Sequence, residues 1–84
     1  MNVKVKLFAT LSDYLPADAR KGNEVALNVP DRVTVAQVIE RFNLPLKLVH
    51  LVLINGHYVP PELRGVRPLS EGDVLAIWPP IAGG

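Results

Sequence analysis

The chain has 84 residues, of which 49% are hydrophobic, and its nine basic and eight acidic residues leave a formal net charge of +1. This length allows one domain with a compact core, and the near-neutral charge gives no electrostatic support for binding nucleic acid or a membrane surface. The sequence has no cysteine, which excludes disulfides, a thiol nucleophile and thiolate zinc ligands. It also has no signal-peptide or membrane-spanning run, so we expect a cytoplasmic protein.

Two runs of alternating apolar and polar residues predict strands, each with one buried face. Their inward positions are Val3, Val5 and Leu7 in the first run, and Val25, Leu27 and Val29 in the second. Lys4 and Lys6 occupy the solvated face of the first strand. Between the two strands, residues 10–15 predict a short helix that ends at Pro16, and residues 16–23 predict a polar surface loop.

The longest predicted helix begins after Thr34. Thr34 and Gln37 have the spacing of a capping box, in which the hydroxyl and the amide each satisfy a main-chain N–H of the first turn. Apolar residues follow at the spacing of one helix face: Val35, Val38, Ile39 and Phe42. Asn43 and then Leu44 end the helix, because the residue before a proline, here Pro45, is disfavoured in the α conformation. We interpret the apolar stripe as a core-facing surface rather than a cofactor site.

The second half of the chain predicts three more strands. Leu51–Ile54 is a continuous apolar run, which is expected of a central strand covered on both faces. Residues 55–56 are Asn-Gly, a strong signal for a two-residue hairpin turn because both residues tolerate positive φ, and residues 57–59 return as the partner strand. A turn at residues 70–73 precedes the last strand, Val74–Trp78.

This order of elements predicts an α+β domain, in which a mixed sheet of four to five strands packs on one main helix. We expect the first and last strands to lie side by side and parallel at the centre of the sheet, because both are rich in β-branched or bulky apolar residues. Residues 1–78 then form the domain, and residues 79–84 leave the middle of the sheet as an extended tail.

The tail reads Pro-Pro-Ile-Ala-Gly-Gly. Pro79 and Pro80 fix φ and have no N–H to donate, so strand pairing stops there. Gly83 and Gly84 have no side chains and fit a slot too narrow for other residues. The tail therefore suits the presentation of a carboxylate to another protein, although a frayed terminus without a function is the alternative.

Residues 75–84 are similar to the ending of the MoaD/ThiS family of ubiquitin-like sulfur carriers, and the order of the predicted elements is similar to the β-grasp fold of that family. Further stretches that fit are residues 5–9, 33–36, 55–56 and 69–74. The resemblance spans the whole chain and is closest to MoaD, the small subunit of molybdopterin synthase. The short link over residues 43–49 resembles the ThiS branch instead, and the near-neutral charge departs from the acidic balance common among MoaD proteins.

The resemblance implies a carrier rather than an enzyme, with no catalytic residues and no stably bound cofactor or metal. An adenylating partner of the MoeB/ThiF type would activate the Gly84 carboxylate, and a sulfur donor would convert it to a thiocarboxylate for molybdopterin synthesis with a large, MoaE-like subunit. The residues that would enter the partners' active sites are Pro79, Pro80, Ile81, Ala82 and Gly83. ATP and its metal would belong to the activating partner, since this chain has no phosphate-binding glycine-rich loop and no carboxylate cluster suited to magnesium.

Three alternatives share the same predicted fold. The first is a ThiS-like carrier that supplies sulfur for the thiazole of thiamin. The second is a ubiquitin-like modifier that becomes conjugated to lysines of other proteins through Gly84. The third is a β-grasp interaction module with an inert tail.

Phe8 and Trp78 are the candidate partner-docking residues. Both faces of the last strand are apolar, so one packs in the core and the other, if uncovered, forms an apolar patch beside the tail. We expect Pro80 and Ile81 to contribute to this patch. The alternative is that both aromatic side chains belong to the core.

The remaining polar candidates predict little chemistry. His50 and His57 have neither a cysteine nor a carboxylate pair near them in the sequence, so we predict no metal site. Arg64 and Arg67 lie in an irregular loop, where we expect solvated side chains, with a contact to an acidic partner surface as the alternative.

Overall fold

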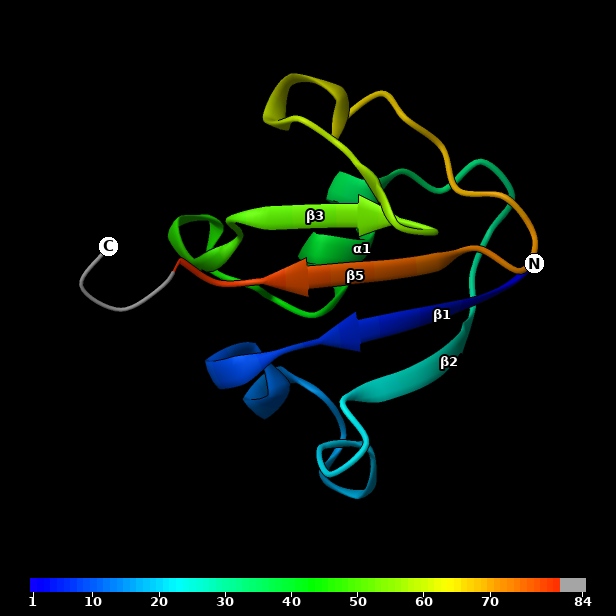
Figure 1. The fold of residues 1–84 in the computed structure, drawn as a ribbon. Helices are drawn as coiled ribbons and strands as arrows, with labels where there is room; N and C mark the ends of the chain where they lie inside the picture. Colours follow the sequence, from blue (N-terminus) through cyan, green and yellow to red (C-terminus); the bar gives the residue numbers. More distant parts are fainter. Residues whose placement is uncertain (81–84) are drawn as a thin grey trace.

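The computed structural model describes residues 1–80. Within these residues, five strands form one mixed sheet in the order β2-β1-β5-β3-β4, and helix α1 packs against one face of it (Figure 1). The strands are β1 (Asn2–Leu7), β2 (Glu24–Asn28), β3 (Leu51–Ile54), β4 (His57–Tyr58) and β5 (Val74–Trp78), and α1 spans Val35–Arg41. Short 3-10 helices in the connections are η1 (Ala9–Tyr14), η2 (Ala17–Ala19), η3 (Leu46–Leu48) and η4 (Pro61–Leu63).

The first and last strands lie side by side, as the sequence predicts. β1 and β5 pair in parallel from Lys4 opposite Val74 to Leu7 opposite Ile77, and β5 pairs on its other side with the antiparallel strand β3. β5 is therefore the middle strand of the sheet, and the chain beyond Trp78 leaves from that middle position. This strand order with one packed helix is the α+β arrangement of the β-grasp fold, which confirms the predicted fold class.

The core lies between the sheet and α1. The side chains of Val5, Leu7, Leu75 and Ile77 are fully buried, and they meet Val35 and Val38 of the helix in one apolar cluster. Complete burial of one such side chain is worth about 1.5–3 kcal/mol relative to leaving it exposed. The middle strands therefore supply much of the apolar burial that stabilises the domain.

The predicted capping box at the start of α1 is confirmed. The main-chain N–H of Gln37 donates to Thr34 Oγ1 over 3.2 Å, and the N–H of Thr34 donates to Gln37 Oε1 over 2.8 Å. The helix ends at Arg41 with Phe42 as its C-cap, directly before the predicted stop at Asn43, which adopts a positive φ of 57°. Asparagine visits this left-handed region more readily than most residues, so the helix stops there.

The predicted hairpin turn is also confirmed. Asn55 and Gly56 have φ values of 50° and 84°, as a two-residue turn between β3 and β4 requires. The Asn55 side chain donates to Asp73 Oδ1 and accepts from the N–H of Val74, each over 2.9 Å. The turn is thereby joined to the start of β5.

One expectation about the elements is wrong. β3 is not covered on both faces, because Val52 and Ile54 are buried whereas Leu51 and Leu53 are half-buried. Only the face toward α1 is packed in the described part of the chain, so the apolar run continues onto an open face. The predicted short helix before Pro16 is present as the 3-10 helix η1, and the polar loop after it contains η2.

Candidate functional site

The root of the predicted tail lies at the end of β5. The N–H of His50 donates to the carbonyl oxygen of Trp78 over 3.0 Å, and Pro79 and Pro80 follow, the first half-buried and the second exposed. Neither proline has an N–H, so the strand cannot extend. The predicted tail residues Ile81, Ala82, Gly83 and Gly84 lie outside the described residues, and their roles stay predictions.

Phe8 and Trp78 form a stacked aromatic pair beside this root. Their ring centroids are 4.3 Å apart and their planes differ by 5°. Phe8 follows β1 directly and Trp78 ends β5, so the parallel pairing of the two strands brings both rings to the same end of the sheet. The N–H of Phe8 also donates to the carbonyl of Ile77 over 3.2 Å, which continues this pairing by one bond.

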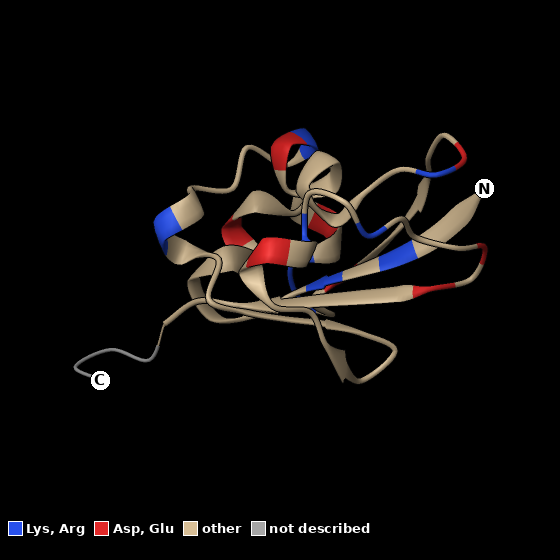
Figure 2. Cartoon of the chain, turned by 90° about the horizontal axis from the view of Figure 1, so that it is seen from above, with Lys and Arg blue, Asp and Glu red and all other residues tan. Residues whose placement is uncertain are grey.

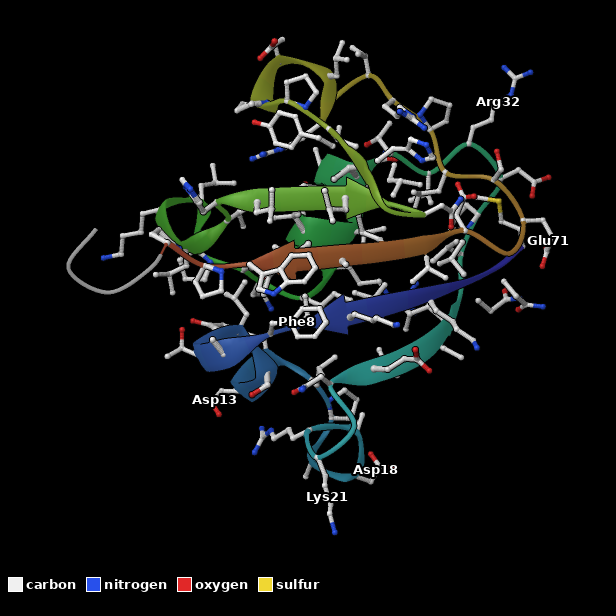
Figure 3. The ribbon with its side chains drawn as sticks, viewed as in Figure 1. Phe8, Asp13, Asp18, Lys21, Arg32 and Glu71 are labelled. Atoms are coloured by element: carbon white, nitrogen blue, oxygen red, sulfur yellow. The ribbon has the colours of Figure 1, made fainter. Side chains whose placement is uncertain are left out.

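Neither aromatic side chain belongs to the core. Both are half-buried and lie outside the cluster of core residues, so the alternative of two core aromatics does not hold. In Figure 3, Phe8 lies in front of the sheet, whereas α1 lies behind it. The pair is therefore on the face of the sheet that the helix leaves open.

The pair continues into a larger apolar surface across the neighbouring strands. Paired residues of adjacent strands point to the same face. Trp78 pairs with Leu51, and Ala76 pairs with Leu53, which in turn pairs with Tyr58. We call this surface the outer patch, and its members are Phe8, Leu51, Leu53, Tyr58, Val74, Ala76 and Trp78, of which Ala76 is buried at the base of the patch. Tyr58 is 55% exposed and marks the open side of the patch.

Charged residues border the outer patch but do not interrupt it. Lys4 and Lys6 share its face on β1, and Lys6 Nζ lies 3.7 Å from Glu24 Oε1 of β2. Figure 2 shows that the β3–β4 hairpin and the end of β5 toward the C-terminus carry no charged residue, whereas the helix and its connections carry several. An open apolar surface of this kind usually marks an interaction site.

Sequence reasoning found Phe8 and Trp78 but missed Leu51, Leu53 and Tyr58. The signal for these residues is the unbroken apolar run of β3, which also fits a strand buried on both faces. In a sheet for which the sequence predicts one main helix, the same run also predicts an uncovered apolar face.

Arg64 differs from the expectation of a solvated side chain. It is half-buried, and its guanidinium donates from Nε to the carbonyl of Val59 and from Nη2 to the carbonyl of His50, each over 3.1 Å. The irregular loop bends back over the body at this point, so the side chain finds main-chain acceptors within the same chain. Arg67 is exposed, as expected.

His50 and His57 are both exposed. Across residues 1–80, no group of three or more histidine, cysteine, aspartate or glutamate residues is arranged to hold a metal ion. The helices in the same part of the chain are all too short or too polar to cross a membrane.

The β-grasp body, with β5 ending at its centre, defines a small ubiquitin-like protein. The model of the ThiS family matches residues 5–84, and the chain belongs to this family. Its members are small carrier proteins rather than catalysts, in line with the predicted resemblance to the MoaD/ThiS group. None of the curated proteins matches this sequence.

Solved structures agree with this assignment. The crystal structure of SAMP1, small archaeal modifier protein 1, of Haloferax volcanii is similar at 26% identity with a TM-score of 0.68, over 100% of both chains. The HVO 2177 protein of Haloferax volcanii is similar at 27% identity with a TM-score of 0.73, over 100% of this chain and 87% of that one.

A third similar structure is a complex of subunits 1 and 2 of the molybdopterin-converting factor of Helicobacter pylori. The likeness has 21% identity and a TM-score of 0.59, and it covers 100% of both chains. At this identity the likeness shows the fold alone.

Proposed function

We propose that this protein is a sulfur carrier of the MoaD type, whose Gly84 carboxylate is adenylated by a partner and converted to a thiocarboxylate for molybdopterin synthesis. The observation that carries the proposal is the position of β5. In this ThiS-family body the middle strand of the sheet ends at Trp78 and is followed by Pro79 and Pro80, so the root of the tail lies at the centre of one end of the sheet.

The chemistry begins with activation by a partner. A carboxylate is a poor electrophile, so a carboxylate oxygen of Gly84 attacks the α-phosphorus of ATP, pyrophosphate leaves and an acyl-adenylate forms. The body contributes by holding the tail in one place, because a positioned group reacts far faster than one that must be encountered from solution. ATP and its metal ion are bound by an adenylating partner of the MoeB/ThiF type, and ATP use agrees with a cytoplasmic location.

Sulfur enters in the second step. The terminal sulfur of a donor persulfide attacks the acyl carbon and displaces AMP. A thiol then cleaves the resulting acyl disulfide, which leaves a thiocarboxylate on Gly84 and a disulfide on the donor side. Since this chain has no cysteine, both the persulfide and the thiol belong to partner proteins.

The outer patch is the proposed docking surface. Fully extended, the six residues from Pro79 to Gly84 reach at most about 20 Å. A partner that takes Gly84 into its active site must therefore come close to Trp78, where the open apolar surface lies. Phe8 and Trp78 then become buried in the complex with the adenylating partner. A large MoaE-like subunit would dock on the same surface, because it must also bind the tail.

Transfer to the acceptor tests the proposed pathway. The thiocarboxylated protein is mixed with a purified large subunit of molybdopterin synthase and its precursor, and its intact mass is followed. We expect the mass to return to that of the carboxylate form as sulfur is delivered. The same loss with a thiazole synthase and its substrates, but not with the large subunit, would replace the proposal with the ThiS-like alternative.

A second candidate is a ubiquitin-like protein modifier, which the 26% identity to SAMP1 over both full chains favours. The activation step is common to both functions, and only the final acceptor differs. Incubation with the adenylating partner, ATP and a cell extract separates them. Adducts in which Gly84 is amide-linked to lysines of other proteins support the modifier, whereas thiocarboxylate without adducts supports the carrier.

A further inference from the structure

Arg64 joins three separate segments of the chain at the end of the sheet from which the tail leaves. Its guanidinium donates to the carbonyl of Val59, just after β4, and to the carbonyl of His50, just before β3. Its own main-chain carbonyl accepts the N–H of Ala36 in the first turn of α1 over 2.8 Å. A planar guanidinium presents its N–H groups in a fixed fork, so the two carbonyls are held at a set separation.

One of these segments also holds the tail root. The N–H of His50 donates to the carbonyl of Trp78 over 3.0 Å, while the carbonyl of His50 accepts from Arg64 Nη2 over 3.1 Å. His50 therefore connects the guanidinium to the last residue of β5. Because Pro79 and Pro80 have no N–H, this bond to Trp78 anchors the main chain at the point where the tail leaves.

We propose that Arg64 is a positioning residue that sets the direction of the tail and so delivers the Gly84 carboxylate to the adenylating partner. The inference rests on the proposed function. For an arm of roughly 20 Å, the upper limit for six residues, a tilt of about 10° at its root displaces the far end by about 3.5 Å. A misplacement of about 1 Å at a reacting atom already costs up to roughly 100-fold in rate, so small movements at the root matter.

Arg20 provides a matched control within the same chain. Its guanidinium also donates to two main-chain carbonyls, from Nε to Leu15 over 3.1 Å and from Nη2 to Asp13 over 3.0 Å. These bonds hold the segment around η1 and do not involve His50 or Trp78. Arg20→Ala therefore removes the same type of interaction without touching the proposed path.

Amide hydrogen exchange tests the structural part of the proposal. The N–H of Phe8, which donates to Ile77 on the other side of β5, serves as the reference within each variant. We expect the N–H of His50 to exchange at least about tenfold faster in Arg64→Ala, relative to Phe8, and to be unchanged in Arg20→Ala. Equal acceleration of His50 and Phe8, or no acceleration at all, would overturn the proposal.

Adenylation kinetics test the functional part. With the adenylating partner, Arg64→Ala is expected to lower kcat for pyrophosphate release about tenfold and to leave KM within about twofold, because docking remains while the carboxylate is misplaced. Arg64→Lys should recover only part of kcat, since one ammonium group cannot reproduce the fork. A raised KM with unchanged kcat, or the same loss in Arg20→Ala, would contradict the assignment. If the wild-type protein is not adenylated, the proposed function fails, while the exchange experiment still decides the role of Arg64 at the tail root.

Discussion

Trp78 makes two interactions at the end of β5, and together with its place before Pro79 they make it the residue that connects the body to the tail. Its carbonyl accepts from His50, its ring stacks on Phe8 at 4.3 Å, and Pro79 follows it directly. Two stacked rings that are each half-buried present a rigid apolar surface, which loses little conformational entropy when a partner covers it. The residue therefore fits both roles assigned to it, as the last residue of β5 and as the centre of docking.

Replacing Trp78 tests the docking role. Because large aromatic side chains dominate binding at protein interfaces, we expect Trp78→Ala to weaken the complex with the adenylating partner by about tenfold or more. Isothermal titration calorimetry measures the affinity, and circular dichroism checks the fold. Leu63→Ala serves as the control, because Leu63 is a 43% exposed apolar residue of η4 outside the outer patch. Unchanged affinity in Trp78→Ala would remove this residue from the docking surface.

Among single residues, those whose partners are close in the sequence are predictable. The capping box of Thr34 and Gln37 was predictable because both partners lie within one turn, and the Asn-Gly turn was predictable because its dihedral angles favour those two residues. The position of Arg64 was not predictable. Its acceptors at His50 and Val59 are brought to it by the path of the loop after β4, and no local pattern encodes that path.

At the scale of elements, α1 depends on its first turn more than a longer helix would. It spans Val35–Arg41, so the turn capped by Thr34 is a large part of the helix. Helices this short are not stable by themselves in water and rely on packing and capping. The buried residues Val35, Val38 and Ile39 supply the packing, and the reciprocal bonds with Gln37 supply the capping.

Thr34→Ala tests the contribution of the capping box. We expect the free energy of unfolding to fall by about 1 kcal/mol, because one main-chain N–H of the first turn loses its acceptor. Urea denaturation followed by circular dichroism measures the change. Thr10→Ala is a suitable comparison, since Thr10 is an exposed threonine of η1. An equal loss in both variants, or no loss in either, would contradict the assigned role of the cap.

The length of the tail is predicted to decide whether Gly84 can be adenylated. Deleting Gly84, or adding one residue after it, is expected to abolish adenylation, because the carboxylate then stops short of the reacting phosphate or passes it. The melting temperature should not change, since the core of the body is unaltered. Pyrophosphate release and thermal unfolding measure the two quantities. Activity that survives either change would exclude activation at this carboxylate.

At the scale of the whole molecule, alternate residues of β5 point to opposite faces of the sheet. One face packs against the helix, and the other carries the outer patch. Leu75 and Ile77 face the helix and are fully buried, whereas Val74, Ala76 and Trp78 face the other side of the sheet, where Val74 and Trp78 are half-buried and the small Ala76 is buried between its neighbours. The apolar character of both faces predicted this division. What the sequence could not supply is how far the patch extends, because that depends on which strands flank β5 and on the pairing of β3 with both of its neighbours.

The open face and the tail root adjoin each other, and this arrangement suits a carrier. A partner that covers the outer patch is automatically close to the end of β5, so docking and delivery of the tail occur together. The near-neutral net charge of +1 leaves apolar contact, rather than long-range attraction, as the main source of affinity for this surface.

The most direct test of the central claim is the mass of the protein after incubation with its adenylating partner, ATP and a sulfur donor. The purified protein is first measured alone to establish that Gly84 carries the free carboxylate. Thiocarboxylate formation at Gly84 predicts a gain equal to the mass difference between one sulfur and one oxygen atom, located on the C-terminal peptide and absent when ATP is omitted or Gly84 is deleted. An unchanged mass, or the same gain on any other peptide, would contradict it.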